Sequence, residues 1–286
     1  MEKAGQGVRS AFGRQQSGTD RTGARTARPL GLRSARRRRE TCAVHRNNDI
    51  LELDRISRSF GSVCVADQLS LNVRNGEALG IIGPNGAGKT SLFNMITGAI
   101  RVDGGAIRFD GVPITDLPPH RRCRIGIARS HQVPRPFADM TVFENVLVGA
   151  TFGADPHSGA ATVPALRALE RTGLLAKANQ RAGALPLLDR KRLELARALA
   201  TGPSLLLLDE IAGGLTEHEV AELIQTIRAL RAEGLTIVWI EHIVHALLAV
   251  VDRLVVLNLG KVLLDGDPHE VMASEQVREI YLGADA

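Results

Sequence analysis

The chain has few cysteines and no apolar run long enough to cross a membrane. Cys42, Cys64 and Cys123 are its only cysteines among 286 residues, and they form no C-x-x-C pair. This spacing argues against a disulfide framework and against a zinc site, and it fits a reducing compartment. The longest apolar stretches, such as residues 243–251, fall short of the roughly 18 residues that a membrane-spanning helix needs. We therefore expect a protein without membrane spans.

Most of the chain carries no excess of positive charge. Residues 1–48 carry 12 basic and three acidic side chains, whereas residues 49–286 carry 24 basic and 28 acidic ones. The formal net charge of +5 therefore comes from the first segment. The remainder is mildly acidic and gives no bulk signal for binding nucleic acid.

Residues 1–48 also lack large apolar residues and hydrophobic periodicity. Such a composition cannot bury enough surface to offset the entropy of ordering, so we expect a disordered basic arm. The run Arg36 to Arg39 is compatible with contact to a membrane surface or to nucleic acid. An Arg-rich, acid-poor start also resembles an organellar transit peptide. An unstructured tail is the simplest interpretation.

Residues 49–286 alternate between strand and helix patterns, which predicts an α/β domain. Apolar and polar residues alternate near residues 50–53 and 69–73, as in a half-buried antiparallel ribbon. Short apolar runs separated by helical segments predict a mostly parallel sheet covered on both faces. The predicted strands are 78–82, 106–109, 205–208 and 235–240, and the predicted helices are 91–97, 193–200 and the segment from the capping box Thr216-x-x-Glu219 to Gly234.

Residues from about 138 to 184 interrupt this alternation. They are mostly helix-prone, at 141–148 and 164–172, with a loop at 153–159 between the two helices. Together with the helix that follows, they predict a helical subdomain of about residues 138–200 inserted into the α/β core.

One glycine-rich segment indicates nucleotide binding. Residues 83–90 fit the pattern G-x-x-x-x-G-K-S/T, with an apolar strand before them and a helix after them. Glycines let backbone N–H groups curl around phosphate oxygens, and the helix start adds a positive dipole. In this pattern Lys89 reaches the β- and γ-phosphates and the Thr90 hydroxyl binds Mg²⁺. The predicted nucleotide-binding residues here are Gly83, Pro84, Asn85, Gly86, Ala87, Gly88, Lys89, Thr90 and Ser91.

Two acidic residues end the apolar run 205–208. Asp209 and Glu210 would lie at the carboxyl edge of a buried strand, where ligands bind in open α/β sheets. We expect Asp209 to hold Mg²⁺, largely through water, and Glu210 to polarise the attacking water. Capping of a helix by this acidic pair is the alternative. His242 ends another apolar strand and could contact a γ-phosphate, although a lone His, like the lone Gln132, is uninformative by itself.

The order of these features resembles the ABC ATPase family. That order is phosphate loop, Gln132, helical insert, a Leu-Glu-Leu-Ala-Arg-Ala-Leu helix, the acidic pair and a strand ending in His242. The resemblance runs from about residue 50 to 286 and implies an ABC-type P-loop core that hydrolyses ATP with Mg²⁺. It also implies that Phe60 stacks on adenine, that Gln132 contacts Mg²⁺ and relays to the transport partner, and that His242 is a switch histidine.

A narrower resemblance is to ATP-binding subunits of branched-chain amino acid importers, whose close relatives carry urea, amides or other small solutes. It rests on A-R-S-H-Q at 128–132, M-T-V-F-E-N-V-L at 140–147, G-L-L at 173–175 and Y-L-G at 281–283. The implied partners are integral-membrane permeases, a second ABC ATPase subunit and, indirectly, a solute-binding protein. The implied location is the cytoplasmic face of the inner membrane.

One family motif is altered. A Leu-Ser-Gly-Gly-Gln-like signature is expected before the helix at 192–199, but residues 185–189 read Leu-Pro-Leu-Leu-Asp. In the family, the signature serine and glycines grip the γ-phosphate held by the opposite subunit. Pro186 has no N–H, and Leu187 and Leu188 carry side chains where glycine would allow close approach. We expect a weakened or rebuilt contact, in which Arg190 and Lys191 could supply charge, and we favour a heterodimer.

Two other readings follow from the residues. An ABC ATPase of nucleic-acid or ribosome biology usually has tandem domains or coiled-coil insertions, whereas this chain has a single site and no heptads. A regulatory subunit that hydrolyses ATP weakly would explain the altered signature. The intact Lys89, Asp209, Glu210 and His242 oppose it.

Overall fold

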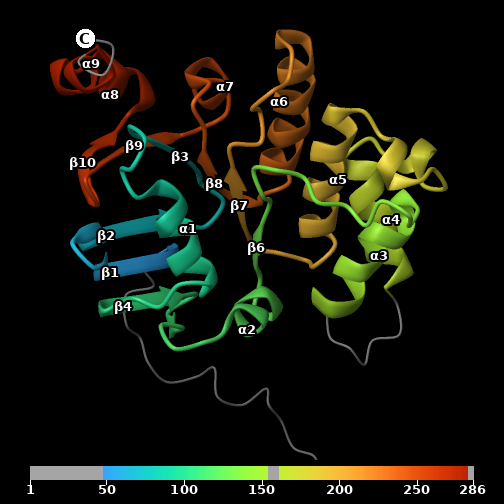
Figure 1. Ribbon diagram of the computed structural model, residues 1–286, viewed down its shortest axis with the longest axis horizontal. Coiled ribbons are helices and arrows are strands. Elements are labelled where there is room, and N and C mark those ends of the chain that lie inside the picture. The colour runs from blue at the N-terminus through green and yellow to red at the C-terminus, as the bar shows by residue number, and fades with distance from the viewer. Residues whose placement is uncertain (1–47, 154–160, 283–286) are drawn as a thin grey trace, which may run out of the picture. The chain divides into compact units, whose positions relative to one another are not determined.

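The computed structural model describes residues 48–153 and 161–282 (Figure 1). Nearly all of the expected basic arm, and most of the loop expected at 153–159, lie outside the described residues. Within the described ranges, no helix combines the length and the apolar character needed to span a membrane.

Four strands form an antiparallel sheet in the order β2-β1-β4-β5. The predicted ribbon is confirmed, because the first two strands pair over most of their length. The predicted turn after Phe109 is also present, with positive φ angles of 49° at Asp110 and 73° at Gly111. The strands are β1 (Asp49–Phe60), β2 (Val63–Arg74), β4 (Gly104–Phe109) and β5 (Val112–Pro113).

Six strands form the second sheet in the order β10-β9-β3-β8-β7-β6, parallel except for β10. The predicted parallel sheet is confirmed, whereas β6, β9 and β10 have no counterpart among the predicted strands. The strands are β3 (Ala78–Ile82), β6 (Ile127–Arg129), β7 (Leu205–Asp209), β8 (Thr236–Ile240), β9 (Arg253–Asn258) and β10 (Lys261–Gly266).

The parallel sheet buries both of its faces. Successive side chains of a strand point to opposite faces, so Leu205 and Leu207 pack with the antiparallel sheet and α1 (Lys89–Thr97), while Leu206 and Leu208 pack with helices on the other side. This two-sided burial explains why the central strands read as continuous apolar runs. Figure 1 shows the antiparallel sheet with α1 to one side of β7 and the helices α3 to α6 to the other.

The predicted helical insert contains three helices, α3 (Val142–Gly153), α4 (Thr162–Arg171) and α5 (Leu187–Leu199). Helix α3 packs closely on the end of α5, since a side chain at Gly149 would meet the Arg197 carbonyl oxygen at 2.5 Å. The second matches the predicted helix closely, whereas the first begins as predicted but runs to Gly153, beyond the predicted end at 148. The third begins at Leu187, several residues before the predicted start at 193.

The remaining helices flank the sheets. The predicted capping box at the start of α6 (Glu217–Ala232) is confirmed, with reciprocal bonds between Thr216 and Glu219. The other helical elements are α2 (Pro119–Arg124), α7 (Val244–Leu248), α8 (Pro268–Ala273), α9 (Glu275–Leu282) and the short 3₁₀ turns η1 (Leu175–Lys177) and η2 (Ala182–Ala184).

One arginine ties the two sheets together. Arg253, at the start of β9, donates to Glu77 Oε1 at 2.8 Å and to Asp265 of β10 at 2.9 Å. It also donates to the Asn72 carbonyl oxygen of β2 at 2.5 Å. Glu77 is buried, so loss of the guanidinium would leave a buried carboxylate without its cationic partner.

We predict that Arg253→Leu lowers the free energy of unfolding by about 3 kcal/mol, because it breaks a mostly buried ion pair. Trp239, the only tryptophan of the chain, is fully buried on β8 and reports unfolding in urea by its fluorescence. Arg108→Leu is the matched control, since Arg108 and Glu52 are partly exposed and 4.0 Å apart. Equal stability losses in the two variants would contradict the prediction.

Candidate functional site

Residues 83–90 connect β3 to α1 and form an open loop of backbone donors. Gly86 and Gly88 have left-handed φ angles of 82° and 99°. The N-cap of α1 is Gly88, which has no side chain to accept a hydrogen bond, and no side chain of the described residues caps the helix start, so its first N–H groups suit an anion. The loop is closely packed from behind, because a side chain at Gly88 would come within 2.3 Å of the Val65 carbonyl oxygen.

Lys89 lies across this loop. Its ammonium donates to the carbonyl oxygens of Gly83 at 2.6 Å and Pro84 at 3.0 Å, and the residue is buried. Burial lowers the pKa of Lys89, and the charges of Glu210 and Asp209 oppose that shift. The predicted phosphate-binding lysine is therefore close to both predicted carboxylates.

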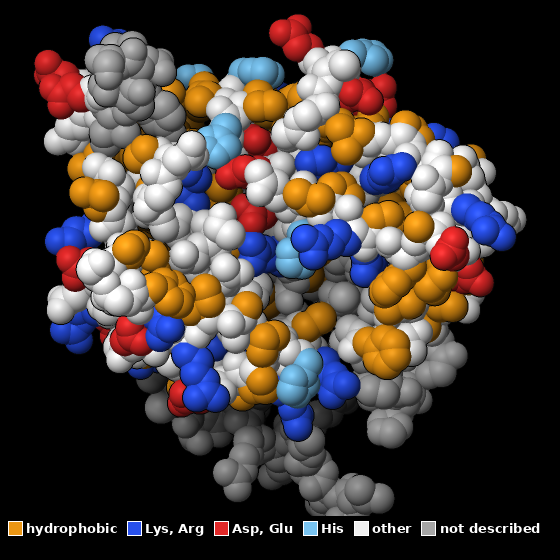
Figure 2. All heavy atoms as spheres, in the orientation of Figure 1, with side chains coloured by type: hydrophobic (Ala, Val, Ile, Leu, Met, Phe, Trp, Pro, Cys, Tyr) orange, Lys and Arg blue, Asp and Glu red, His pale blue; other side chains and the backbone are white. Residues whose placement is uncertain are grey.

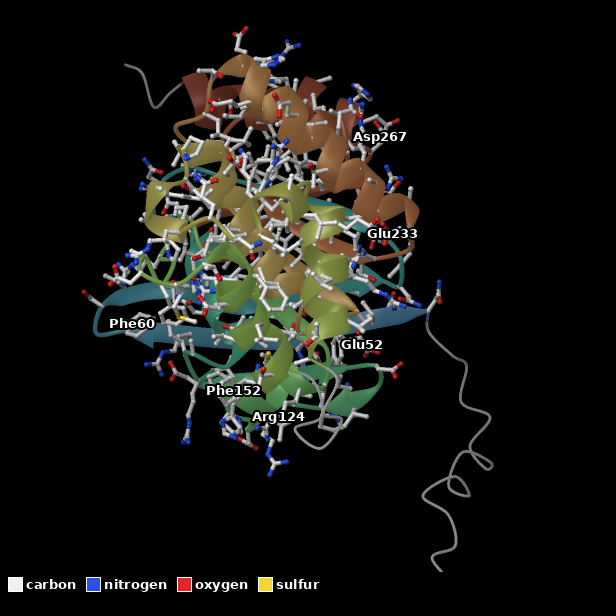
Figure 3. All side chains as sticks on the ribbon, turned by 90° about the vertical axis from the view of Figure 1, so that its right-hand side faces the viewer. Glu52, Phe60, Arg124, Phe152, Glu233 and Asp267 are labelled. Carbon is white, nitrogen blue, oxygen red and sulfur yellow. The ribbon has the colours of Figure 1, made fainter. Side chains whose placement is uncertain are left out.

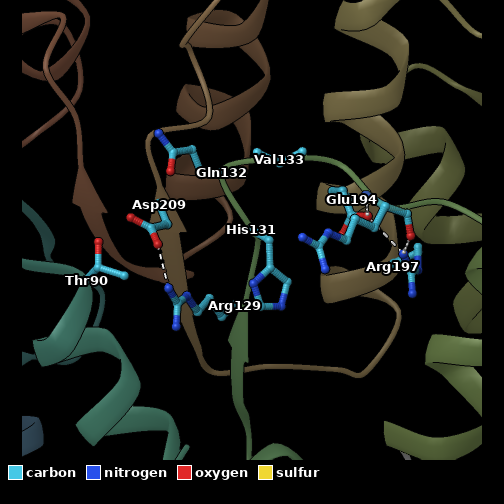
Figure 4. Close-up of a pocket in the computed structure, with 9 residues that line it drawn as sticks. Thr90, Arg129, His131, Gln132, Val133, Glu194, Arg197 and Asp209 are labelled. Carbon is cyan, nitrogen blue, oxygen red and sulfur yellow. Dashed lines mark hydrogen bonds and ion pairs between the residues drawn. The ribbon is translucent and has the colours of Figure 1, made fainter.

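Asp209 and Thr90 line the same pocket of about 520 Å³ (Figure 4). Asp209 is the last residue of β7, and Thr90 is in the first turn of α1. Gln132 and Arg129 also line this pocket. One oxygen of Asp209 accepts a hydrogen bond from Arg129 Nη2 at 2.5 Å. Sequence reasoning assigned no role to Arg129, although it occupies the last position of the strand that precedes Gln132.

Glu210 brings together three residues that the sequence predicts separately. Gln132 Nε2 donates to Glu210 Oε2 at 2.5 Å, and His242 Nε2 lies 2.8 Å from Glu210 Oε1. The backbone of Glu210 is left-handed, with φ of 46°, while its N–H donates to the Ile240 carbonyl oxygen at 2.8 Å. Residues held in such a conformation cluster at functional sites.

A buried acid holds the loops around this cluster, and sequence reasoning missed it. Glu241 accepts hydrogen bonds from the backbone N–H of Ala212 at 2.9 Å and of His242 at 3.0 Å. Burial raises the pKa of Glu241, and these backbone donors partly offset the rise. The carboxylate thus links the segment after Glu210 to His242. An acidic residue at the end of an all-apolar strand is the signal that could have revealed it.

The surface around the cluster carries mixed charge. Figure 2 shows acidic side chains beside a histidine near the ends of β7 and β8, with basic side chains directly below them.

Phe60 lies at the tip of the β1–β2 hairpin (Figure 3). Its ring is 45% exposed, and the Arg58 guanidinium carbon lies 4.5 Å from the ring centroid. Phe60 pairs with Val63, close in the chain to the Val65 carbonyl that abuts Gly88. This places the hairpin tip beside the phosphate loop, as a base-stacking residue requires.

The altered signature forms the start of α5. Pro186 is the N-cap, Leu187 is 40% exposed, and Leu188 is buried in the core. Arg190 donates to the Leu185 and Gly183 carbonyl oxygens, at 2.8 Å and 3.0 Å. Lys191 donates to the Gln132 carbonyl oxygen at 2.9 Å. Both cations that could have rebuilt the contact are therefore directed toward carbonyls of their own chain.

The donors around Asp209 fit Mg²⁺ held together with phosphate. Hydroxyl, amide and carboxylate oxygens are hard ligands, and Mg²⁺ usually binds through one or two carboxylates plus substrate phosphates. Among the described residues, no group of three His, Cys, Asp or Glu side chains could hold a metal by itself. The roles of Thr90, Gln132 and Asp209 as metal ligands stay predictions.

Comparison with known proteins identifies the class. A family model described as ABC transporter matches residues 66–213. The ATP-binding protein BraF for high-affinity branched-chain amino acid transport in Pseudomonas aeruginosa is 36% identical over 82% of this chain and 98% of its own. The chain therefore belongs to the ABC transporter family, as one of its ATP-binding, ATP-hydrolysing subunits.

Three further comparisons concern the subfamily and the fold. A second family model, described as branched-chain amino acid ATP-binding cassette transporter, matches residues 261–286. The lipopolysaccharide export ATP-binding protein LptB of Haemophilus influenzae is 35% identical over 82% of this chain and 97% of its own. A crystal structure of the ADP conformation of an ABC transporter cassette has a TM-score of 0.76 and 31% identity, covering 82% of this chain and 99% of its own. The predicted ABC fold and the resemblance to the branched-chain amino acid type are confirmed.

We predict that Glu210→Gln keeps ATP affinity but slows turnover by about 10²–10⁴-fold, the effect of losing a general base. The variant should accumulate as an ATP-bound closed dimer. Lys89→Ala is the contrasting variant, because it removes the phosphate-binding charge and should lose ATP binding. ATP binding and phosphate release measured on both variants test this. Hydrolysis at the wild-type rate by Glu210→Gln would exclude Glu210 as the base.

Proposed function

We propose that this chain powers an importer of branched-chain amino acids or similar small organic solutes. The match over residues 261–286 carries the proposal, because it lies outside residues 66–213, which match the general ABC transporter model. The core alone does not discriminate, since the relative LptB is 35% identical and its name describes lipopolysaccharide export. We infer that the transporter imports its solute only from the similarity to this subfamily.

The site suggests how the residues divide the reaction. Backbone donors of residues 83–91 and the Lys89 ammonium bind the phosphates, and the exposed Phe60 ring stacks on the base. Glu210 polarises the attacking water, while Gln132 and His242 hold that carboxylate from two sides. Thr90, Gln132 and Asp209 would hold Mg²⁺, which when bound supplies positive charge to the phosphates.

The proposed partners follow from the same family. Residues 49–286 form the ATP-binding domain, with a helical subdomain of about residues 138–200. The chain binds integral-membrane permease subunits at the cytoplasmic face of the inner membrane as a peripheral subunit. A solute-binding protein delivers the solute to the permeases, and nucleic acid is not a partner.

The substrate is testable in the source cells. We predict that replacing the chain by its Glu210→Gln variant abolishes ATP-driven uptake of radiolabelled leucine, isoleucine or valine, because hydrolysis stops while the complex still assembles. The matched control is Leu175→Ser, which changes an exposed side chain that does not line the pocket. Unchanged uptake of all three amino acids in Glu210→Gln cells would contradict branched-chain amino acids as the transported solute.

We further propose that the subunit works as one half of a heterodimer. In the family arrangement, each ATP lies between the phosphate loop of one subunit and the signature of the other. A homodimer of this chain would present Pro186, Leu187 and Leu188 to both nucleotides. Leu187 is 40% exposed, so part of its apolar side chain lies on the surface at this position. A partner with an intact signature would complete one full site with this chain's Glu210.

We predict that the purified subunit alone hydrolyses ATP slowly, and that changing residues 186, 187 and 188 to Ser, Gly and Gly raises the rate at least 10-fold. The restored backbone donors stabilise developing charge, an effect typically worth 10²–10³-fold per donor. Leu199→Gly, which removes another buried leucine of α5, is the control for the lost packing of Leu188. Robust cooperative hydrolysis by the unmodified subunit, insensitive to the triple change, would contradict the asymmetric arrangement.

A further inference from the structure

Arg129 joins three elements that surround the candidate Mg²⁺ site. It is the last residue of β6, and its side chain is only 10% exposed. Guanidinium Nη2 donates to Asp209 Oδ2 of β7 at 2.5 Å, and Nη1 donates to Asn94 Oδ1 of α1 at 2.6 Å. Figure 4 shows the bond between Arg129 and Asp209, with Thr90 facing the same space.

These contacts set the spacing between two of the three predicted metal ligands, Thr90 and Asp209. Asn94 follows Thr90 by one turn of α1, so both lie on the same side of that helix. The guanidinium carbon also lies 5.6 Å from the Phe93 ring centroid, which adds a second contact to α1. Because guanidinium is a planar, rigid fork, its two bonds fix Asp209 and Asn94 at a defined separation.

The arrangement leaves Asp209 available to a metal. Arg129 takes only the Oδ2 oxygen, and among the described residues no donor is bonded to Oδ1. Hydrogen bonding of one carboxylate oxygen orients the other, as partners of metal ligands do in many metal sites. Arg129 suits the role of orienting Asp209, because its guanidinium is buried and donates one hydrogen bond to the Asp209 carboxylate and one to the Asn94 amide oxygen.

We propose that Arg129 is a positioning residue that holds Asp209 in register with Thr90 and so sets the affinity of the nucleotide site for Mg²⁺. This rests on the proposed binding of Mg-ATP by Thr90 and Asp209. Asn94 is the second part of the device, because it fixes the guanidinium to the helix that carries Thr90.

Arg129 also places a positive charge near the candidate Mg²⁺ site. That charge repels the cation, so its effect on Mg²⁺ affinity is opposite to the effect of orienting Asp209. If charge dominated, removing Arg129 would strengthen Mg²⁺ binding by relieving repulsion. If orientation dominates, loss of either arm of the fork weakens Mg²⁺ binding. Asn94 separates the two effects, because its substitution frees the guanidinium without changing any charge.

The test measures binding of a fluorescent ATP analogue to the purified full-length subunit while Mg²⁺ is titrated, and again in EDTA. We expect Asn94→Leu to raise the half-saturating Mg²⁺ concentration by about 10-fold, within the range for lost partners of metal ligands. Affinity for the analogue in EDTA should stay unchanged. Arg129→Lys keeps the charge but loses the fork, and it should show the same shift.

Arg122→Met is the matched control. Arg122 is also buried and also holds α1, through the Met95 and Ile96 carbonyl oxygens at 2.7 Å and 2.9 Å. It lies at the other end of the helix, so its loss should lower the melting temperature without changing the Mg²⁺ requirement. This separates loss of helix stability from loss of metal positioning.

Two results would overturn the assignment. One is an unchanged Mg²⁺ requirement in Asn94→Leu. The other is tighter Mg²⁺ binding in Arg129→Met, which would mean that Arg129 acts on Mg²⁺ only through charge repulsion. Absence of Mg²⁺-dependent nucleotide binding in the wild-type subunit is a different failure. It would refute the proposed Mg-ATP site itself.

Discussion

The parallel pairing of β6, β7, β8 and β3 is the constraint on which the site depends. Parallel neighbours end at the same edge of a sheet, so whatever follows each strand meets there. The phosphate loop follows β3, the acidic pair ends β7, Glu241 and His242 follow β8, and Gln132 follows β6. Residues far apart in the sequence therefore lie close together at this edge. A shift in the register of one strand would break the hydrogen bonds of Glu210 with Gln132 and His242.

Local chemistry made some of this predictable. The glycine pattern at 83–90, the apolar runs of β3, β7 and β8, and the capping box of α6 are each encoded within a few neighbouring residues. The strand β6 was not predictable, because Ile127–Arg129 is too short to show periodicity. The contacts of Glu210 with Gln132 and His242 span 78 and 32 residues, so they depend on sheet register, which no local pattern contains.

The early start of α5 has a similar explanation. The family resemblance places a signature motif at residues 185–189, before the helix, so the predicted helix starts after them. In the structure, Pro186 supplies a suitable N-cap conformation, with φ of −66° and ψ of 168°, and Leu188 adds core contacts. The helix then holds the Gln132 loop at successive turns through Lys191, Glu194 and Arg197. The loop is thus bonded to three successive turns of the helix.

The left-handed backbone of Glu210 has a consequence for how this protein can evolve. A non-glycine residue there costs about 1 kcal/mol or more, and glycine would remove that cost together with the carboxylate. The stability of the fold and the proposed role of Glu210 in hydrolysis therefore favour different residues at this position. Under relaxed selection for turnover, mutational drift at this position would favour the more stable and less active chain.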